Sequence, residues 1–350
     1  MVNLFGVDAT YALSFVSGLV LVVYGMRSLA TGFQTLFSKV IRKLINSLTT
    51  NPLTCLILGM GNSFFIQSEL SISIMALSYA GSGLLSLSQL MMILLGSGIG
   101  TVPTVWLFAL PFEFLDLLFI SIAALPMMYT RWTWMSALAK IIFSIGLMFL
   151  GFNLMVARPS EDFLQMFSQA FSWYAPLPGF TQTLLLVLPA VVLALSFRSI
   201  VALVAGLMAL VYSGVMSASL GVLFVIAINF ARTIPVVVSS MESGRGPRRG
   251  ALSHLLVQLI GFILICISLP WLFDLLNELV PVSADDPWAN MLWIPITHTL
   301  LNFFVVIVCS VLFVPIRNLV ILLLPDAKEK EPQKLKFLGR VSHMSPTLAI

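Results

Sequence analysis

Long apolar runs with few charges dominate this 350-residue sequence. A helix needs about 20 mainly apolar residues to cross the hydrocarbon core of a bilayer. Charged residues make up 9% of the chain, whereas soluble domains carry about 25%. The sequence therefore predicts an all-α polytopic membrane protein and excludes a soluble enzyme and a nucleic-acid binder. The candidate spans are residues 11–26, 84–110, 117–128, 134–155, 217–238, 251–273 and 293–314.

Two further apolar stretches, residues 51–80 and 180–213, carry polar interruptions and predict broken helices or re-entrant helical hairpins. Residues 38–46 predict a short amphipathic helix at the membrane surface. The pattern divides the chain into a first transmembrane repeat (1–130), a second repeat with a closing helix (131–325) and a basic cytoplasmic tail (326–350).

The loop charges predict how the chain lies across the membrane. The net charge is +4, and Lys and Arg gather near residues 27–43, 245–249 and 317–340. Cytoplasmic loops carry the excess of basic residues. Segments with Asp8, with Glu113 and Asp116, with Glu161 and Asp162, and with Asp274–Asp286 lack that excess and are assigned outside. We expect a multi-pass plasma membrane protein of the bacterial inner-membrane type, with its N-terminus outside and its C-terminus in the cytoplasm.

An internal repeat appears at a shift of 131 residues. The shift places Gln67-Ser68 on Arg198-Ser199 and Ser82-Gly83 on Ser213-Gly214, and it places residues 96–101 on 227–232. The loop that follows is acidic in the first copy and basic in the second. Equivalent loops on opposite sides of a membrane are the mark of inverted-topology repeats, which build transport sites on discontinuous helices.

Several motifs resemble the sodium-dependent phosphate cotransporter family. QSELS (67–71) is similar to its first QSSS motif, and GSGIGT (96–101) is similar to the glycine-rich segment that follows. AINFART (227–233) resembles a degenerate second copy, and HTLLN (298–302) resembles the family's closing motif. The resemblance covers roughly residues 10–325.

The resemblance implies a secondary transporter of inorganic phosphate or a related oxyanion, coupled to sodium or to protons, that works by alternating access. It implies no cofactor beyond sodium ions, and the partners are the anion and the lipid bilayer; an oligomer is compatible with it. The implied substrate-binding residues are Gln67, Ser68, Thr101, Arg198, Ser199 and Thr233. The implied residues for the coupling ion or a charge pair are Glu69, Ser71, Gly98, Asn229 and Arg232.

Charged residues replace neutral family residues at three of these positions, namely Glu69, Arg198 and Arg232. A charge inside a membrane span is costly and usually faces a partner or a wet cavity. Glu69 and Arg198 occupy related repeat positions, so they either bind anion and coupling ion or lock one another in a structural pair. Arg232 either lies deep, near the substrate, or extends toward the inner surface; the sequence leaves both alternatives open.

The sequence also bears on other classes of function. The sequence contains no HExxH, GxSxG or GxxxxGK[ST] motif and no Cys/His cluster, so no enzyme is expected. His254 and His298 are expected near the ends of spans as packing residues. The alternatives to a coupled transporter are a coupling-deficient uniporter or exporter, a pseudo-transporter that acts as a scaffold or regulator, and an ion channel.

Overall fold

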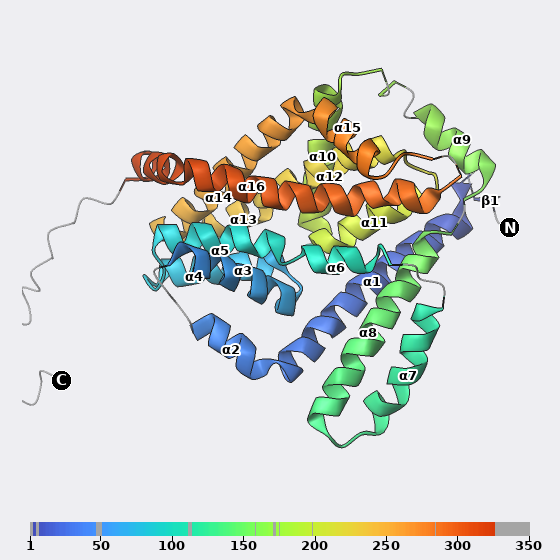
Figure 1. Cartoon of the computed structure of the whole chain (residues 1–350), viewed down its shortest axis with the longest axis horizontal. Coiled ribbons are helices and arrows are strands. Elements are labelled where there is room, and N and C mark those ends of the chain that lie inside the picture. Colours follow the sequence, from blue (N-terminus) through green and yellow to red (C-terminus); the bar gives the residue numbers. More distant parts are fainter. Residues whose placement is uncertain are drawn as a thin grey trace, which may run out of the picture.

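The computed structural model describes residues 3–4, 7–46, 51–110, 114–157, 159–170, 173–174, 176–197, 199–283 and 285–325. Helices dominate these residues, and a small antiparallel pair of strands precedes them (Figure 1). The strands are β1 (Asn3–Leu4) and β2 (Val7–Asp8), and the helices are α1 (Ala9–Leu36), α2 (Ser38–Asn46), α3 (Pro52–Ile66), α4 (Glu69–Gly81), α5 (Leu87–Ile99), α6 (Val102–Leu107), α7 (Leu115–Tyr129), α8 (Thr133–Met155), α9 (Glu161–Ala170), α10 (Gly179–Phe197), α11 (Ile200–Tyr212), α12 (Ala218–Ala231), α13 (Thr233–Ser240), α14 (Arg245–Ile267), α15 (Leu269–Leu279) and α16 (Pro287–Leu323).

Seven helical stretches of the described residues are long and apolar enough to cross a membrane. They are α1, α8, α10, α14, α16 and the joined pairs α5–α6 and α12–α13. This confirms the prediction of an all-α, multi-pass membrane protein. The expected span at 117–128 is instead the short helix α7, whose 15 residues reach only about 22 Å at 1.5 Å per residue.

The interrupted stretches form broken helices, as predicted. The first is α3 followed by α4, and the second is α10 followed by α11. The short helix α2 has the bounds expected from its amphipathic pattern. The cause of both breaks is local, because a serine caps the second helix of each pair.

Helix boundaries follow the repeat observed in the sequence. The shift of 131 residues carries the start of α4 (Glu69) onto the start of α11 (Ile200), and the start of α5 onto the start of α12. The connecting turns match as well, since Gly83 and Gly214 share a φ of 77°. The opposite orientation of the two copies across a membrane remains a prediction.

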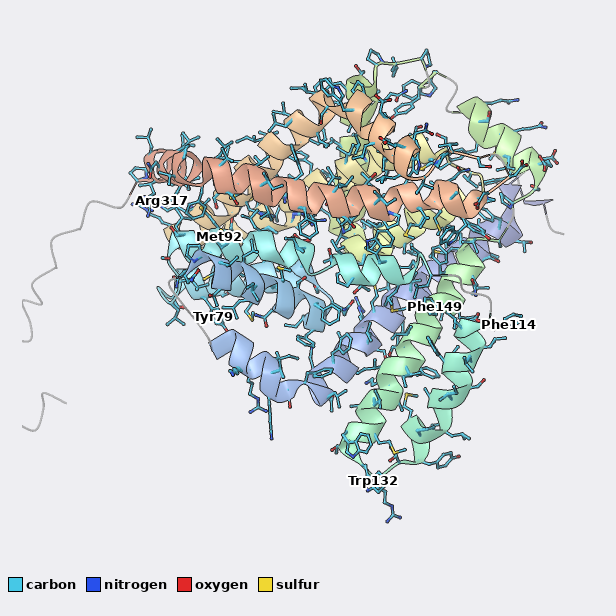
Figure 2. The ribbon with its side chains drawn as sticks, viewed as in Figure 1. Tyr79, Met92, Phe114, Trp132, Phe149 and Arg317 are labelled. Atoms are coloured by element: carbon cyan, nitrogen blue, oxygen red, sulfur yellow. The ribbon has the colours of Figure 1, made fainter. Side chains whose placement is uncertain are left out.

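Helices α1 and α8 pack so closely that their backbones nearly touch. A Cβ atom added to Gly18 would lie 2.3 Å from the carbonyl oxygen of Gly151, and one added to Gly151 would lie 2.6 Å from that of Gly18. Small residues at helix crossings permit this approach in membranes. Helices α7 and α8 project from the rest of the molecule beside α1, and Trp132 marks the free end of the pair (Figures 1 and 2).

Three acidic segments that we expected to be loops are helical where the structure describes them. Asp116 lies in the first turn of α7, where it is buried and accepts a hydrogen bond from Asn153 at 3.0 Å. Glu161 and Asp162 begin α9, and α15 contains Asp274 and Glu278. Acidic residues are favourable in the first turn because of the helix dipole. Glu113 and the predicted tail at 326–350 lie outside the described residues.

Candidate functional site

The first helix break is built by Gln67 and Ser68. Gln67 ends α3 in the left-handed conformation, with φ 55° and ψ 30°. Ser68 is extended, and its hydroxyl accepts a hydrogen bond from the backbone N–H of Ser71, which caps the start of α4. Left-handed backbone in a residue other than glycine is costly and is often found at functional sites. The break therefore leaves the N-terminus of α4 facing inward.

The second break has the same construction. Ser199 is extended and its hydroxyl accepts a hydrogen bond from the backbone N–H of Ala202, which caps α11. This hydroxyl also lies 3.7 Å from the sulfur of Met26 in α1. Arg198, which precedes it, lies outside the described residues, so the role predicted for Arg198 stays a prediction.

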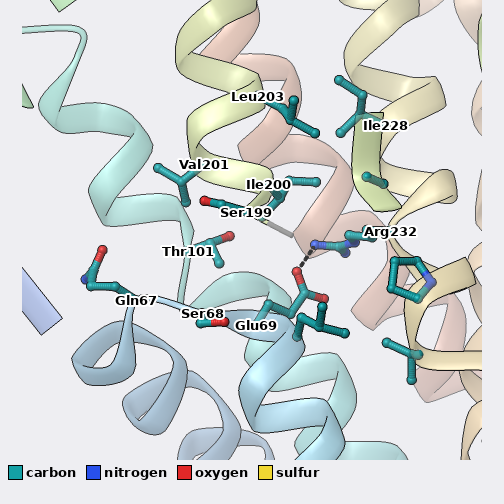
Figure 3. A pocket seen from close by; sticks show the side chains of 14 residues that line it. Gln67, Ser68, Glu69, Thr101, Ser199, Ile200, Val201, Leu203, Ile228 and Arg232 are labelled. Atoms are coloured by element: carbon teal, nitrogen blue, oxygen red, sulfur yellow. Dashed lines mark hydrogen bonds and ion pairs between the residues drawn. The ribbon is translucent and has the colours of Figure 1, made fainter. Parts of the chain in front are cut away.

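Figure 3 shows that the starts of α4 and α11 face one cavity. Thr101 and Arg232 line the cavity from the breaks between α5 and α6 and between α12 and α13. Two helix N-termini supply backbone N–H donors and positive dipole ends. The remaining lining residues are Gln67, Ser68, Glu69, Leu70, Ala194, Ser199, Ile200, Val201, Leu203, Ile228, Pro235 and Val236.

A salt bridge between Glu69 and Arg232 lies in this cavity. Nη1 of Arg232 donates to Oε2 of Glu69 at 2.8 Å, and each side chain is 8% exposed. The sequence left the depth of Arg232 open, and the structure places its guanidinium deep. Glu69 therefore has Arg232 as its partner among the described residues.

A buried polar network holds the guanidinium of Arg232 from its other side. Nη2 donates to Oδ1 of Asn302 at 2.9 Å, and Nε donates to the carbonyl oxygen of Asn229 at 3.1 Å. Gly98 is needed here, because an added Cβ would lie 2.6 Å from Oδ1 of Asn302 and 2.9 Å from Nη2 of Arg232. With three of its donors engaged, the fork is fixed before any ligand arrives.

His298 connects this network to the first repeat. Its ring lies 3.3 Å from the hydroxyl of Thr101 and 3.4 Å from the side-chain amide nitrogens of Asn229 and Asn302. His254 is also fully enclosed, and neither of its ring nitrogens has a partner among the described residues. The expectation that His254 and His298 lie near span ends is wrong, because both sit deep inside long helices, α14 and α16.

Some of the predicted site residues line the cavity, and others mainly support the helix breaks around it. The lining residues among them are Ser68, Glu69, Thr101, Ser199 and Arg232.

Gln67 also lines the cavity, but its amide accepts from Thr104 at 2.9 Å and donates to the carbonyl of Phe64, so it mainly holds the break. Thr233 is fully buried and its hydroxyl donates to the carbonyl of Phe230. Ser71 bonds to the hydroxyl of Ser68 at 2.8 Å and lies beside a second cavity.

Sequence reasoning missed three residues of this region. Asn302 and Thr104 are buried partners of site residues, and Arg27, assigned to a basic surface cluster, lines the second cavity. Asn302 could have been found as a polar residue one helical turn after His298 in an apolar segment. No cluster of three His, Cys, Asp or Glu side chains suited to a metal occurs in the part of the chain that the structure describes.

Comparisons with known proteins find similarity to phosphate transport proteins. Residues 21–157 match the model of the Na+/Pi-cotransporter family, which confirms the resemblance over those residues. The chain is 22% identical over 269 residues to the YjbB protein of Salmonella typhimurium. The aligned stretch covers 76% of this chain and 48% of that protein.

The YjbB protein of Escherichia coli K12 is 22% identical over 275 residues, covering 78% of this chain and 50% of that protein. The names of both proteins assign them provisionally to inorganic phosphate export. The chain spans about half the length of the curated relatives it matches, and no solved structure matches it. Family and relatives are described as transport proteins, in agreement with the expectation that the chain is not an enzyme.

Proposed function

We propose, from the premise that residues 21–157 carry the Na+/Pi-cotransporter family pattern, that this chain transports inorganic phosphate across a membrane. The observation that carries the proposal is the cavity where the N-termini of α4 and α11 meet beside Arg232. Helix N-termini and a guanidinium fork both suit the oxygens of phosphate.

The chemistry of binding follows from which donors are available. The hydroxyls of Ser68 and Ser199 accept their capping bonds through lone pairs. Ser199 donates its hydrogen to the sulfur of Met26 at 3.7 Å, and the hydroxyl of Ser68 shares a hydrogen bond with that of Ser71 at 2.8 Å, so a bound anion would replace these partners. Arg232 keeps part of its fork on Glu69. A phosphate ion would add negative charge beside this carboxylate. We expect binding to weaken the Glu69–Arg232 pair and to favour a cation or a proton near Glu69.

Two coupling schemes follow from that charge balance. In coupled transport, sodium or a proton neutralises Glu69 when phosphate binds Arg232. In the second scheme the fixed guanidinium of Arg232 supplies the positive charge itself, and the chain acts as an uncoupled uniporter or exporter. The salt bridge supports the second scheme, because the guanidinium of Arg232 already supplies positive charge where a coupling ion would otherwise be needed.

Phosphate flux into proteoliposomes tests the proposal. We expect saturable uptake in the wild type, and its dependence on sodium and proton gradients separates the two coupling schemes. Ser199→Ala removes a cap and a cavity hydroxyl, and we expect its KM for phosphate to rise about tenfold to a hundredfold, equivalent to one hydrogen bond to a charged group.

Ser217→Ala is the matched control, because Ser217 caps α12 in the same way and is absent from the lining of the cavity. We expect its KM to remain that of the wild type. Equal KM changes in the two variants, or an absence of phosphate flux under every gradient, would overturn the proposal.

A further inference from the structure

A second cavity lies between α1 and the two helix breaks. The space between its lining residues is about 1050 Å³ with open solvent included, so the cavity is partly open. One face of α1 lines it, with side chains spaced at the three- and four-residue intervals of a helical stripe. Its lining residues are Val23, Met26, Arg27, Ala30, Thr31, Gln34, Ile66, Gln67, Ser68, Leu70, Ser71, Phe197 and Ser199.

The two cavities share a wall made of Gln67, Ser68, Leu70 and Ser199. These are the residues at the helix breaks, so a ligand in the second cavity would lie directly beside the serine hydroxyls of the first. The Glu69–Arg232 pair belongs to the inner cavity, and the outer cavity is bounded by α1.

Arg27 is the charged residue among the described residues that line the outer cavity. It belongs to α1, a helix long and apolar enough to span a membrane, where a guanidinium is costly unless it faces water or an anion. Among the described residues, its side chain forms no ion pair or hydrogen bond. The side chain of Arg27 is exposed, so its guanidinium remains available to a ligand that enters the cavity.

The polar groups around Arg27 suit a phosphate-type oxyanion. Gln34 follows it on the same face of α1, and Ser68 and Ser71 line the same cavity. Thr31 lies one turn after Arg27, and its hydroxyl donates to the backbone carbonyl of Arg27 at 2.9 Å. Hydroxyl and amide donors beside a guanidinium fork form the donor set that binds phosphoryl oxygens in proteins. The described lining contains no carboxylate that would repel the ligand.

We propose that Arg27 forms an outer subsite for a phosphoryl oxyanion, where the ligand binds before it passes Ser68 and Ser199 into the inner cavity. The inference rests on the proposed function and extends it from one site to two. The phosphoryl group is carried by inorganic phosphate or by the headgroup of an anionic lipid, and both present the same oxygens to the guanidinium.

The test is calorimetric titration of the purified protein with inorganic phosphate in phosphate-free detergent. Arg27→Gln should weaken phosphate binding about tenfold, as expected for the loss of a charge-assisted contact. Arg27→Lys keeps the charge without the fork and should give an intermediate affinity. Arg42→Gln on the exposed face of α2 changes the net charge equally and should bind as the wild type does.

Short-chain phosphatidylglycerol supplies the second arm. If it competes with phosphate in the wild type and loses that competition in Arg27→Gln, the subsite accepts a lipid phosphoryl group. If it does not compete, the ligand at Arg27 is the free ion.

Equal affinities in Arg27→Gln, Arg42→Gln and the wild type, with no difference in lipid competition, would overturn the subsite. Binding is measured without transport, so a wild type that binds phosphate at Arg27 and shows no flux would contradict the proposed function and leave the subsite standing. Flux that depends on Ser199 but is indifferent to Arg27 would contradict the subsite alone.

Discussion

At the scale of single residues, the site depends on a buried charge pair that its surroundings hold in place. Nη1 of Arg232 lies 2.8 Å from Oε2 of Glu69. The other guanidinium nitrogens donate to Oδ1 of Asn302 and to the carbonyl oxygen of Asn229. Removing one partner of a buried pair leaves an uncompensated charge, whereas replacing both with neutral residues is often close to neutral. The pair therefore makes a prediction about stability that is independent of transport.

We expect Glu69→Gln and Arg232→Gln each to destabilise the protein by about 3–5 kcal/mol, as found for broken buried pairs. The double variant should be less destabilised than the sum of the two single variants. Denaturation of the detergent-solubilised proteins measures all three. Strictly additive losses would show that the two side chains do not interact as the structure has them.

How much of this site could be predicted from sequence depends on the residue. Ser68 and Ser199 were identifiable because a polar break in an apolar run, followed by a helix, requires a cap. The partner of Glu69 was not identifiable, because two guanidiniums stand in related positions and the depth of each depends on how its helix breaks. Arg232 ends α12, and the turn directs its side chain inward toward α4 and α16.

At the scale of helices, close backbone packing of α3 against α5 positions the first helix break beside the break between α5 and α6. A Cβ added to Gly96 would lie 2.0 Å from the carbonyl oxygen of Leu56, and one added to Gly59 would lie 2.2 Å from that of Ile93. Backbone atoms cannot turn aside as a flexible side chain can, so these glycines fix the distance between the helices. Gly96 belongs to the GSGIGT segment identified in the sequence, whereas Gly59 was not singled out there, and the carbonyls that both glycines face depend on helix rotation.

Gly96→Ala should destabilise the protein by about 1–3 kcal/mol, the usual cost of overpacking. Gly206→Ala in α11 is the control, since its Cβ would meet only the ring of Phe15, at an ordinary 3.7 Å. This control should gain up to about 1 kcal/mol from helix propensity. The prediction fails if thermal denaturation in detergent ranks the two variants equally.

At the scale of the whole molecule, two repeats in register at 131 residues meet at one cavity. The turn before α5 lies beside α14, where Gly81 faces Pro247, and the turn before α12 lies beside the start of α1, where Ser213 and Tyr11 hydroxyls are 3.2 Å apart. Figure 1 shows α4 at one end of the long helix α16 and α11 toward its other end. Inverted repeats would place the two turns on opposite sides of a membrane.

Ser82→Cys and Ser213→Cys test that topology, because they are equivalent positions of the two repeats. The native cysteines, Cys55, Cys266 and Cys309, are all buried and should give little background. In right-side-out vesicles, a membrane-impermeant maleimide should label one variant directly and the other only after permeabilisation. Labelling of both from the same side would exclude inverted repeats.

The central claim is that phosphate binds where the N-termini of α4 and α11 meet. The rate of thiol modification in Ser68→Cys and Ser199→Cys measures this directly, with Ser217→Cys as the control at a helix start outside the cavity. We predict that phosphate, but not an equal concentration of chloride, slows modification of Cys at both break positions and leaves the control unchanged. Modification rates indifferent to phosphate at both breaks, or slowed equally in the control, would contradict the account.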